Sequence, residues 1–254
     1  MNGRMLSKNE VKYIQSLKAK KQRLEANAFV VEGHKTVLEL LAHQRWIVQA
    51  LYGTETFLQT IPKNLTLPAK TVTISQEDLE RISFLQTPQS CLAVVALPAA
   101  ASAHFPANNW SLLLDDIQDP GNLGTIIRIA DWFGIEHIFA TEHTADVYNP
   151  KVIQASMGGF LRVQMHYGPC AVWLQQQQPV CYIADMHGHN VWQLQQPQPG
   201  VLVIGNEGNG VSEHIAAFAT QTISIPKLGA AESLNAGVAT GILLSHLLQT
   251  TSKA

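Results

Sequence analysis

The chain has 254 residues, 46% of them hydrophobic and 14% charged, with a formal net charge of −2 at pH 7. This composition is typical of a packed globular protein and excludes a disordered chain, and the length suffices for one or two domains. No apolar stretch is long enough to span a bilayer, and the first ten residues lack a signal-peptide core, so we expect no membrane partner. Only Cys91, Cys170 and Cys181 are present, which argues against a disulfide framework and predicts a cytoplasmic location.

The small net charge hides an asymmetry between the two halves of the chain. Residues 1–109 carry 12 Lys and Arg and 8 Asp and Glu, a formal net charge of +4. Residues 110–254 carry 5 Lys and Arg and 11 Asp and Glu, a formal net charge of −6. A basic leading segment on an acidic body predicts a polyanionic partner at the N-terminal end. A solvated helix face rich in lysine is the alternative. The basic residues of the first 25 positions are Arg4, Lys8, Lys12, Lys18, Lys20, Lys21 and Arg23.

The first 97 residues are expected to form a small α/β module. Helical spacing of apolar residues covers 11–26, 36–43 and 76–82, and Ser75 is a plausible N-cap for the last of these helices. Strand patterns cover 29–31, 47–52, 71–74 and 91–97. Residues 98–109 begin with small residues bracketed by Pro98 and Pro106, which predicts a linker.

The second half, residues 110–254, alternates short apolar strands with helices. Strands are expected at 112–114, 138–140, 162–165, 181–184, 201–204 and 222–225, and helices at 125–133, 150–156, 170–176, 212–219 and 233–248. This alternation predicts a parallel sheet that is covered on both faces. Ligands of such sheets bind beyond the carboxyl ends of the strands.

Three glycine- and asparagine-bearing segments, 111–125, 201–210 and 223–235, each run from one of these strands into a loop, which indicates one cofactor site built from three loops. A dinucleotide loop is disfavoured, because 205–210 has the pattern Gly-x-x-Gly-x-Gly and not Gly-x-Gly-x-x-Gly. A zinc site at His187, His189 and Cys181 is disfavoured by poor spacing and a missing fourth ligand.

Together the three segments resemble the SpoU (TrmH) family of RNA ribose 2′-O-methyltransferases, in the SPOUT superfamily. The resemblance covers residues 110–254, and residues 1–97 resemble the family's N-terminal RNA substrate-binding module through Ser7-Lys-Asn, residues 17–23 and residues 29–33. It implies a parallel-sheet SPOUT domain with a deep trefoil knot, S-adenosylmethionine as methyl donor, an RNA substrate, a homodimer through the SPOUT domain and no metal. Ribosomal RNA is favoured over transfer RNA.

The resemblance assigns catalytic roles to Asn122, Arg128, Glu207 and Asn235. Arg128, expected in the first turn of its helix, would lie near the target ribose and the RNA phosphate. Because arginine does not ordinarily deprotonate, we expect it to clamp phosphate and stabilise the alkoxide, with the final proton acceptor left open. A helix-start arginine held by Asp119 or Asp131 is the structural alternative. Glu207 is expected to orient Asn122 or to balance Arg128.

Cofactor contacts are implied at both later segments. They fall on Gly205, Asn206, Gly210, Ile225, Ser233 and Leu234. Ser233 would also serve as the N-cap of the last helix, whose Gly237 and Gly241 permit close packing. A purely structural role for each loop is the alternative.

The chain departs from the family pattern at Lys227, Gly237 and Gln154, where Met, a serine-containing tripeptide and Arg are frequent. These three differences concern residues that are expected to affect contacts with the RNA substrate, and not the cofactor site. A non-enzymatic RNA-binding protein on the same scaffold would lack one of the four catalytic residues, and all four are present. A base-methylating SPOUT enzyme is disfavoured by the pair Asn122 and Arg128.

Overall fold

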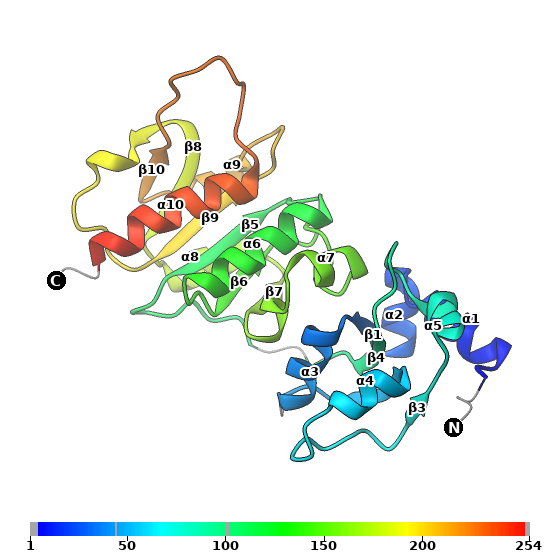
Figure 1. Ribbon diagram of the computed structural model, residues 1–254. Helices are drawn as coiled ribbons and strands as arrows, with labels where there is room; N and C mark the ends of the chain where they lie inside the picture. The colour runs from blue at the N-terminus through cyan, green and yellow to red at the C-terminus, as the bar shows by residue number, and fades with distance from the viewer. Residues whose placement is uncertain (1–4, 44, 100–101, 252–254) are drawn as a thin grey trace. The chain divides into compact units, whose positions relative to one another are not determined.

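The computed structural model describes residues 5–43, 45–99 and 102–251 of the chain (Figure 1). Two units are distinguished, residues 1–99 with 148–161 and residues 100–147 with 162–254. The predicted domain limits at 97 and 110 stay a prediction, and the segment 148–161 belongs to the first unit.

A mixed four-stranded sheet of order β1-β4-β2-β3 organises the first unit. β4 is antiparallel to both β1 and β2, and β3 is parallel to β2. The elements are α1 (Lys8–Ser16), α2 (Lys20–Ala26), β1 (Ala28–Glu32), α3 (His34–Ala42), β2 (Val48–Gly53), α4 (Glu55–Thr60), β3 (Thr71–Thr73), α5 (Gln76–Ile82), β4 (Cys91–Ala96), α7 (Pro150–Ala155) and η1 (Gly159–Leu161).

Most predicted elements of this unit are confirmed, but the single helix expected over 11–26 is wrong. The chain breaks between α1 and α2, where Leu17 turns into the core and is fully buried. Ser75 caps α5, as predicted, by accepting from the backbone N–H of Asp78. The helix α4, which Thr54 caps, was not predicted.

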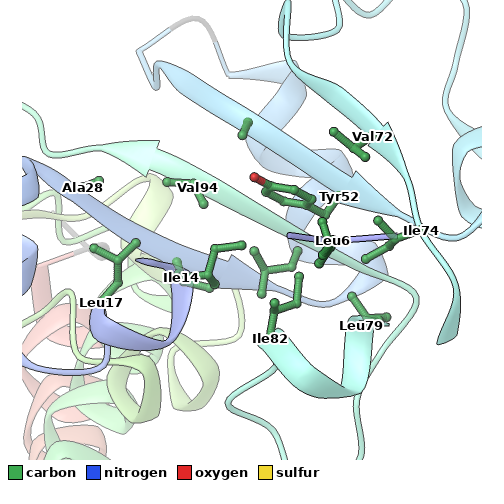
Figure 2. Packing of buried hydrophobic residues seen from close by; sticks show 13 residues of the cluster. Leu6, Ile14, Leu17, Ala28, Tyr52, Val72, Ile74, Leu79, Ile82 and Val94 are labelled. Carbon is green, nitrogen blue, oxygen red and sulfur yellow. The ribbon is translucent and has the colours of Figure 1, made fainter. Parts of the chain in front are cut away.

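Apolar side chains cover both faces of this sheet. Figure 2 shows one face, where Ile14 and Leu17 of the N-terminal segment pack with Leu79 and Ile82 of α5. On the other face the ring of Phe29 lies 4.6 Å from that of Tyr148 and 6.2 Å from that of Phe160. These ring contacts explain why residues 148–161 belong to the first unit.

A six-stranded sheet of order β10-β8-β9-β5-β6-β7 organises the second unit, and all of its neighbouring strands pair in parallel. The predicted parallel α/β fold is therefore confirmed, whereas the implied knot stays a prediction. The elements are β5 (Ser111–Asp115), α6 (Pro120–Trp132), β6 (His137–Ala140), β7 (Gln164–Tyr167), α8 (Cys170–Gln177), β8 (Cys181–Asn190), η2 (Val191–Gln193), β9 (Val201–Gly205), α9 (Glu213–Ala216), β10 (Gln221–Ser224) and α10 (Ala236–Thr251).

Helices cover both faces of the parallel sheet. α8 and α9 pack on the face that carries Leu113 and Val203, together with Phe105 of the expected linker. α6 and α10 lie side by side, and α10 also contacts β9 (Figure 1). Within the described residues, no helix combines the length and the apolar character that a membrane crossing requires.

Candidate functional site

Three polar side chains from the three predicted segments meet beyond the carboxyl ends of β5, β9 and β10. The Nδ2 group of Asn122 donates a hydrogen bond to Oε1 of Glu207. The Nδ2 group of Asn235 donates to Oδ1 of Asn122 at 2.7 Å. Glu207 and Asn235, which lie 85 and 113 positions after Asn122 in the sequence, thus bind the same side-chain amide. We call these three residues the amide relay.

The start of α6 places Asn122 in this relay. Asp119 is the N-cap, and its carboxylate accepts from the backbone N–H of Asn122 at 2.9 Å. Pro120 occupies the first turn, where its missing N–H and fixed φ favour helix initiation. The helix therefore begins at Pro120, and the predicted start near Thr125 is wrong.

Arg128 consequently lies in the middle of α6 and not in its first turn. At about 1.5 Å per residue it sits roughly 9 Å along the helix axis from Asn122. Its side chain is exposed, and among the described residues no hydrogen bond or ion pair is found for its guanidinium. The alternative partners are engaged elsewhere: Asp131 binds Arg162 through two hydrogen bonds of 2.6 and 2.7 Å, and Asp119 caps α6.

The loop after β9 is closed by Asn206. Its backbone pairs with that of Gly210 in both directions, at 3.0 and 2.9 Å. Its side chain donates to the Asp116 carbonyl and accepts from the backbone N–H groups of Gly208 and Asn209. Asn206 therefore uses its side chain to shape the loop, which leaves mainly backbone groups for a ligand.

Gly205 and Gly210 are glycines for steric reasons. A Cβ atom on Gly205 would overlap the carbonyl group of Gly210, so only glycine allows the loop to fold back on the end of β9. Gly210 has a φ of +68°, in the left-handed region that favours glycine. The carboxyl end of β9 therefore carries no side chain at the place where a cofactor is expected.

Sequence reasoning missed the buried carboxylate of Asp115, at the end of β5. Its Oδ2 atom accepts from the backbone N–H of Ser212 at 2.8 Å and from the Ser212 hydroxyl at 2.6 Å. The bond joins the end of β5 to the residue that precedes α9. A charged residue directly after three leucines of a buried strand was the available signal, because a buried carboxylate needs partners.

Asn235, and not Ser233, caps the last helix. The Oδ1 atom of Asn235 accepts from the backbone N–H groups of Gly237 and Val238, at 3.0 and 3.3 Å. The predicted N-cap role of Ser233 is therefore wrong, and α10 begins at Ala236. Asn235 joins the relay with its amide NH₂ and caps α10 with its oxygen, so the helix start fixes the relay geometry.

The segment between β10 and α10 is open. Ile225 is partly buried, whereas every residue from Lys227 to Asn235 is exposed, including Leu228 at 100% and Leu234 at 47%. Among the described residues, no hydrogen bond is found for positions 226–234. Figure 1 shows this segment as a long arch. Its free backbone groups and exposed leucines suit a ligand with both polar edges and apolar faces, such as an adenosine.

Close packing of α10 on α6 supports the site. A Cβ atom on Gly237 would lie 2.8 Å from Cγ2 of Thr125, so glycine at this departure from the family pattern has a packing reason. Gly241 faces Ile129 with more room, at 3.6 Å. Gln154, another departure, lies exposed on α7 in the first unit.

The basic residues of the N-terminal segment are of two kinds. Lys8, Lys12, Lys18 and Lys20 are exposed. Arg23 is 2% exposed, and its Nη1 group donates to the carbonyls at positions 17 and 18, at the end of α1. Its predicted place in an RNA-facing basic segment is wrong, because it stabilises a helix end instead. Arg4 lies outside the described residues.

The cysteines offer no reactive thiolate. All three are free and buried, and burial raises the pKa of each thiol to about 12. No group of three or more His, Cys, Asp or Glu residues in the described part of the chain has the arrangement of a metal site.

Comparison with known proteins covers both units. The family described as SpoU rRNA Methylase matches residues 109–245, and the MRM3-like substrate binding domain matches residues 8–93. The 23S rRNA (guanosine(2553)-2′-O)-methyltransferase RlmP of Bacillus subtilis strain 168 is 30% identical over 246 residues, which cover 95% of this chain and 97% of that relative.

Two solved structures are similar over nearly the whole chain. A protein of the TrmH family from Porphyromonas gingivalis has a TM-score of 0.85 and 40% identity, covering 96% of this chain and 98% of that one. The SpoU methyltransferase AviRb from Streptomyces viridochromogenes, solved in complex with AdoMet, has a TM-score of 0.86 and 25% identity, covering 98% and 100%. The similarity thus includes both units and both of their sheets.

Proposed function

The chain belongs to the SpoU rRNA methylase family, and we propose that its amide relay and Arg128 form the site that methylates a ribose 2′-hydroxyl of structured RNA. The chain is an S-adenosylmethionine-dependent RNA methyltransferase. The observation that carries the site assignment is the relay itself, in which three loops at one sheet edge share the amide of Asn122.

The cofactor is held by the glycine loop after β9 and the open segment after β10. Gly205 and Gly210 let the loop fold back on the end of β9 with no side chain in the way, and Asn206 holds that loop in shape. Ile225, Ser233 and Leu234 supply apolar surface and free backbone groups for the adenosine. When bound, S-adenosylmethionine supplies an electrophilic sulfonium methyl group, so the protein has only to align the nucleophile and manage its proton.

The chain's own groups position the ribose. Arg128 has no intramolecular partner among the described residues, so its five donors are available for an RNA phosphate and the developing alkoxide. Glu207 orients Asn122, which fixes the amide that faces the cofactor loops. Asn235 holds the other end of that amide. Such preorganised polar groups stabilise charge that develops in the transition state.

Ribosomal RNA is the preferred substrate. RlmP acts on 23S rRNA, and the match to the MRM3-like substrate binding domain covers most of the first unit. The exposed lysines of α1 and α2 supply positive charge that the acidic second unit lacks. Residues 1–97 therefore bind RNA, residues 98–109 connect, and residues 110–254 carry out transfer.

A homodimer through the methyltransferase domain is part of the proposal. Trp132 at the end of α6 is 84% exposed, and Val238 on the adjacent α10 is 50% exposed. Exposed large apolar side chains on neighbouring helices are suited to an interface. A cytoplasmic location and a reaction without metal complete the proposal.

The test is methyl transfer from radiolabelled S-adenosylmethionine to an unmodified 23S rRNA transcript, with a 16S rRNA transcript and unmodified transfer RNA in parallel. The product is digested to nucleosides. We expect label in one 2′-O-methyl nucleoside of ribosomal RNA. Label in a methylated base would identify a base methyltransferase, and cofactor binding to neither the free nor the RNA-bound protein would indicate a non-enzymatic RNA-binding protein.

A further inference from the structure

The second unit has very few cations for an enzyme that must hold a polyanion. Residues 102–147 and 162–251, the described part of this unit, contain eleven Asp and Glu but only three Arg and Lys, a formal charge of −8. The three cations are Arg128, Arg162 and Lys227. RNA carries a charge on each phosphate, and cations that contact phosphates supply much of the affinity for nucleic acid.

Only two of these cations are available to RNA. Arg162 is held by both carboxylate oxygens of Asp131. In the described part of the chain, neither Arg128 nor Lys227 has a hydrogen-bonded or ion-paired partner, and both are exposed. Arg128 already belongs to the proposed catalytic site, which leaves Lys227 without an assigned role.

Lys227 lies on the open segment whose far end, Asn235, belongs to the amide relay. Lys227 is the third residue after β10, on the open segment that ends at Asn235. One end of this segment is anchored by the Ser224 hydroxyl, which donates to the Gly188 carbonyl at 2.8 Å, and the other end is anchored by the relay bond from Asn235 to Asn122. Both anchors lie at the carboxyl edge of the parallel sheet.

The intervening chain gives Lys227 freedom to reach a ligand. Positions 226–234 form no hydrogen bond among the described residues, so no interaction of the backbone has to be broken when the segment moves. The lysine ammonium is a compact charge on a flexible four-carbon stem, which suits a phosphate whose position varies. Glu232, the acid on this segment, is exposed and not bonded to Lys227.

We propose that Lys227 is a positioning residue that binds a phosphate of the RNA next to the target nucleotide, in partnership with Arg128. The inference rests on the proposed function. The carboxylate of the cofactor's methionine is the competing anion, and the experiment separates the two.

The experiment compares wild type with Lys227→Met. Affinity for an unmodified 23S rRNA transcript is measured between 50 and 200 mM salt, with S-adenosylhomocysteine present to prevent turnover. S-adenosylmethionine affinity is measured by calorimetry without RNA. Gln198→Glu is the matched control, since it also lowers the net charge by one. Gln198 is exposed and lies just before β9, at the amino ends of the parallel strands.

Loss of one phosphate contact lowers the slope of log affinity against log salt by about 0.7 to 0.9. The ratio of wild-type to Lys227→Met affinity for RNA is therefore expected to fall about threefold when the salt concentration rises from 50 to 200 mM. The KM for RNA should rise with kcat nearly unchanged, and cofactor affinity should equal that of wild type. Gln198→Glu should leave the slope unaltered.

Two results would overturn the inference. A weakened cofactor affinity with an unchanged salt slope would assign Lys227 to the methionine carboxylate, and unchanged values in both assays would leave it without a role in binding. If the proposed function is wrong, the wild-type protein transfers no methyl group to RNA. The role of Lys227 is tested separately, by the difference in RNA affinity between the variant and the wild type.

Discussion

Asn122 uses both ends of its amide, and this double use makes it sensitive to the smallest possible substitution. Its Nδ2 group donates to Glu207, while its Oδ1 atom accepts from Asn235. An aspartate at position 122 would keep the shape and the acceptor but would place a second carboxylate against Glu207. Like charges at hydrogen-bonding distance repel, so the relay would open.

We predict that Asn122→Asp lowers kcat roughly 100-fold, the order of magnitude for loss of one preorganised polar group. Adding Glu207→Gln restores a hydrogen bond with donor and acceptor exchanged, and should recover part of the loss. A double-mutant cycle on single-turnover rates measures this coupling. Additive effects of the two substitutions would show that the relay does not act as a unit.

The contact between α6 and α10 depends on two glycines that differ in the space around them. Gly237 faces Thr125, a β-branched side chain with little rotational freedom, whereas Gly241 has room for a methyl group. A side-chain Cβ at 2.8 Å from Thr125 Cγ2 forces a shift of one helix, and the contact at 3.6 Å does not.

Opposite effects on stability are therefore expected. Gly237→Ala should destabilise the protein by about 1–3 kcal/mol through overpacking. Gly241→Ala should stabilise it by up to about 1 kcal/mol, because alanine favours the helix interior more than glycine. Chemical denaturation of both variants tests the pair, and equal changes in the two free energies would contradict the packing argument.

The start of α1 carries a capping box, which gives it a defined pH dependence. Ser7 and Glu10 bond reciprocally, and Glu10 also pairs with Lys70 at 3.2 Å. The backbone hydrogen bond from Ser7, more than the charge of Lys70, lowers the pKa of Glu10 to about 2. Between about pH 4.5 and 2, Glu10 is protonated in the unfolded chain and still ionised in the folded protein. The free energy of unfolding therefore falls as pH falls through this range.

Glu10→Gln should remove this contribution. Wild type is expected to be more stable than the variant near neutral pH, and the difference should shrink between pH 4.5 and 2. Urea unfolding at several pH values measures it. A difference between the two proteins that does not depend on pH would refute the assignment of the lowered pKa to Glu10.

The sequence predicted the strands of both sheets well, and it predicted the starts of α5, α7 and α8, but it misplaced the starts of α6 and α10. Strand runs such as 201–204 are buried on both faces and therefore consist of consecutive apolar residues, which the sequence reveals directly. The start of α6 was placed five residues late because Pro120 and Gly121 suggest a turn, while Asp119 in fact caps the helix. Caps depend on which oxygen reaches which N–H group, and Ser233 and Asn235 are indistinguishable in that respect until the backbone is known.

The site was predicted as a set of residues but not as an arrangement. The four catalytic positions and six cofactor positions came from the family resemblance, and three of them are joined by hydrogen bonds in the relay. The bond between Asp115 and Ser212 links positions 97 residues apart, so no local pattern predicts it. The long-range polar contacts are the part that requires the structure.

At the scale of the whole molecule, the charge is divided between a basic half, residues 1–109, and an acidic half, residues 110–254. Deleting residues 1–25 is a poor test of this division, because the deletion would remove Leu6, Ile14 and Leu17 from the core of the first unit (Figure 2). Neutralising the exposed lysines leaves that core intact.

We predict that replacing Lys8, Lys12, Lys18 and Lys20 together by Gln weakens affinity for 23S rRNA and lowers its salt slope by at most about 3.6. Cofactor affinity, a property of the other unit, should not change. Filter binding at several salt concentrations and calorimetry check both statements. An unaltered salt slope would mean that RNA binds to a different surface.

The most direct measurement is single-turnover methyl transfer to ribosomal RNA by Arg128→Ala and Arg128→Lys, with cofactor and RNA both saturating. We predict cofactor affinity equal to that of wild type, a loss of roughly 100-fold or more in the rate for Arg128→Ala, and a smaller loss for Arg128→Lys, which keeps the charge without the planar fork. A rate for Arg128→Ala equal to that of wild type would contradict the proposed role of Arg128, since the methyl-transfer site would then lie elsewhere.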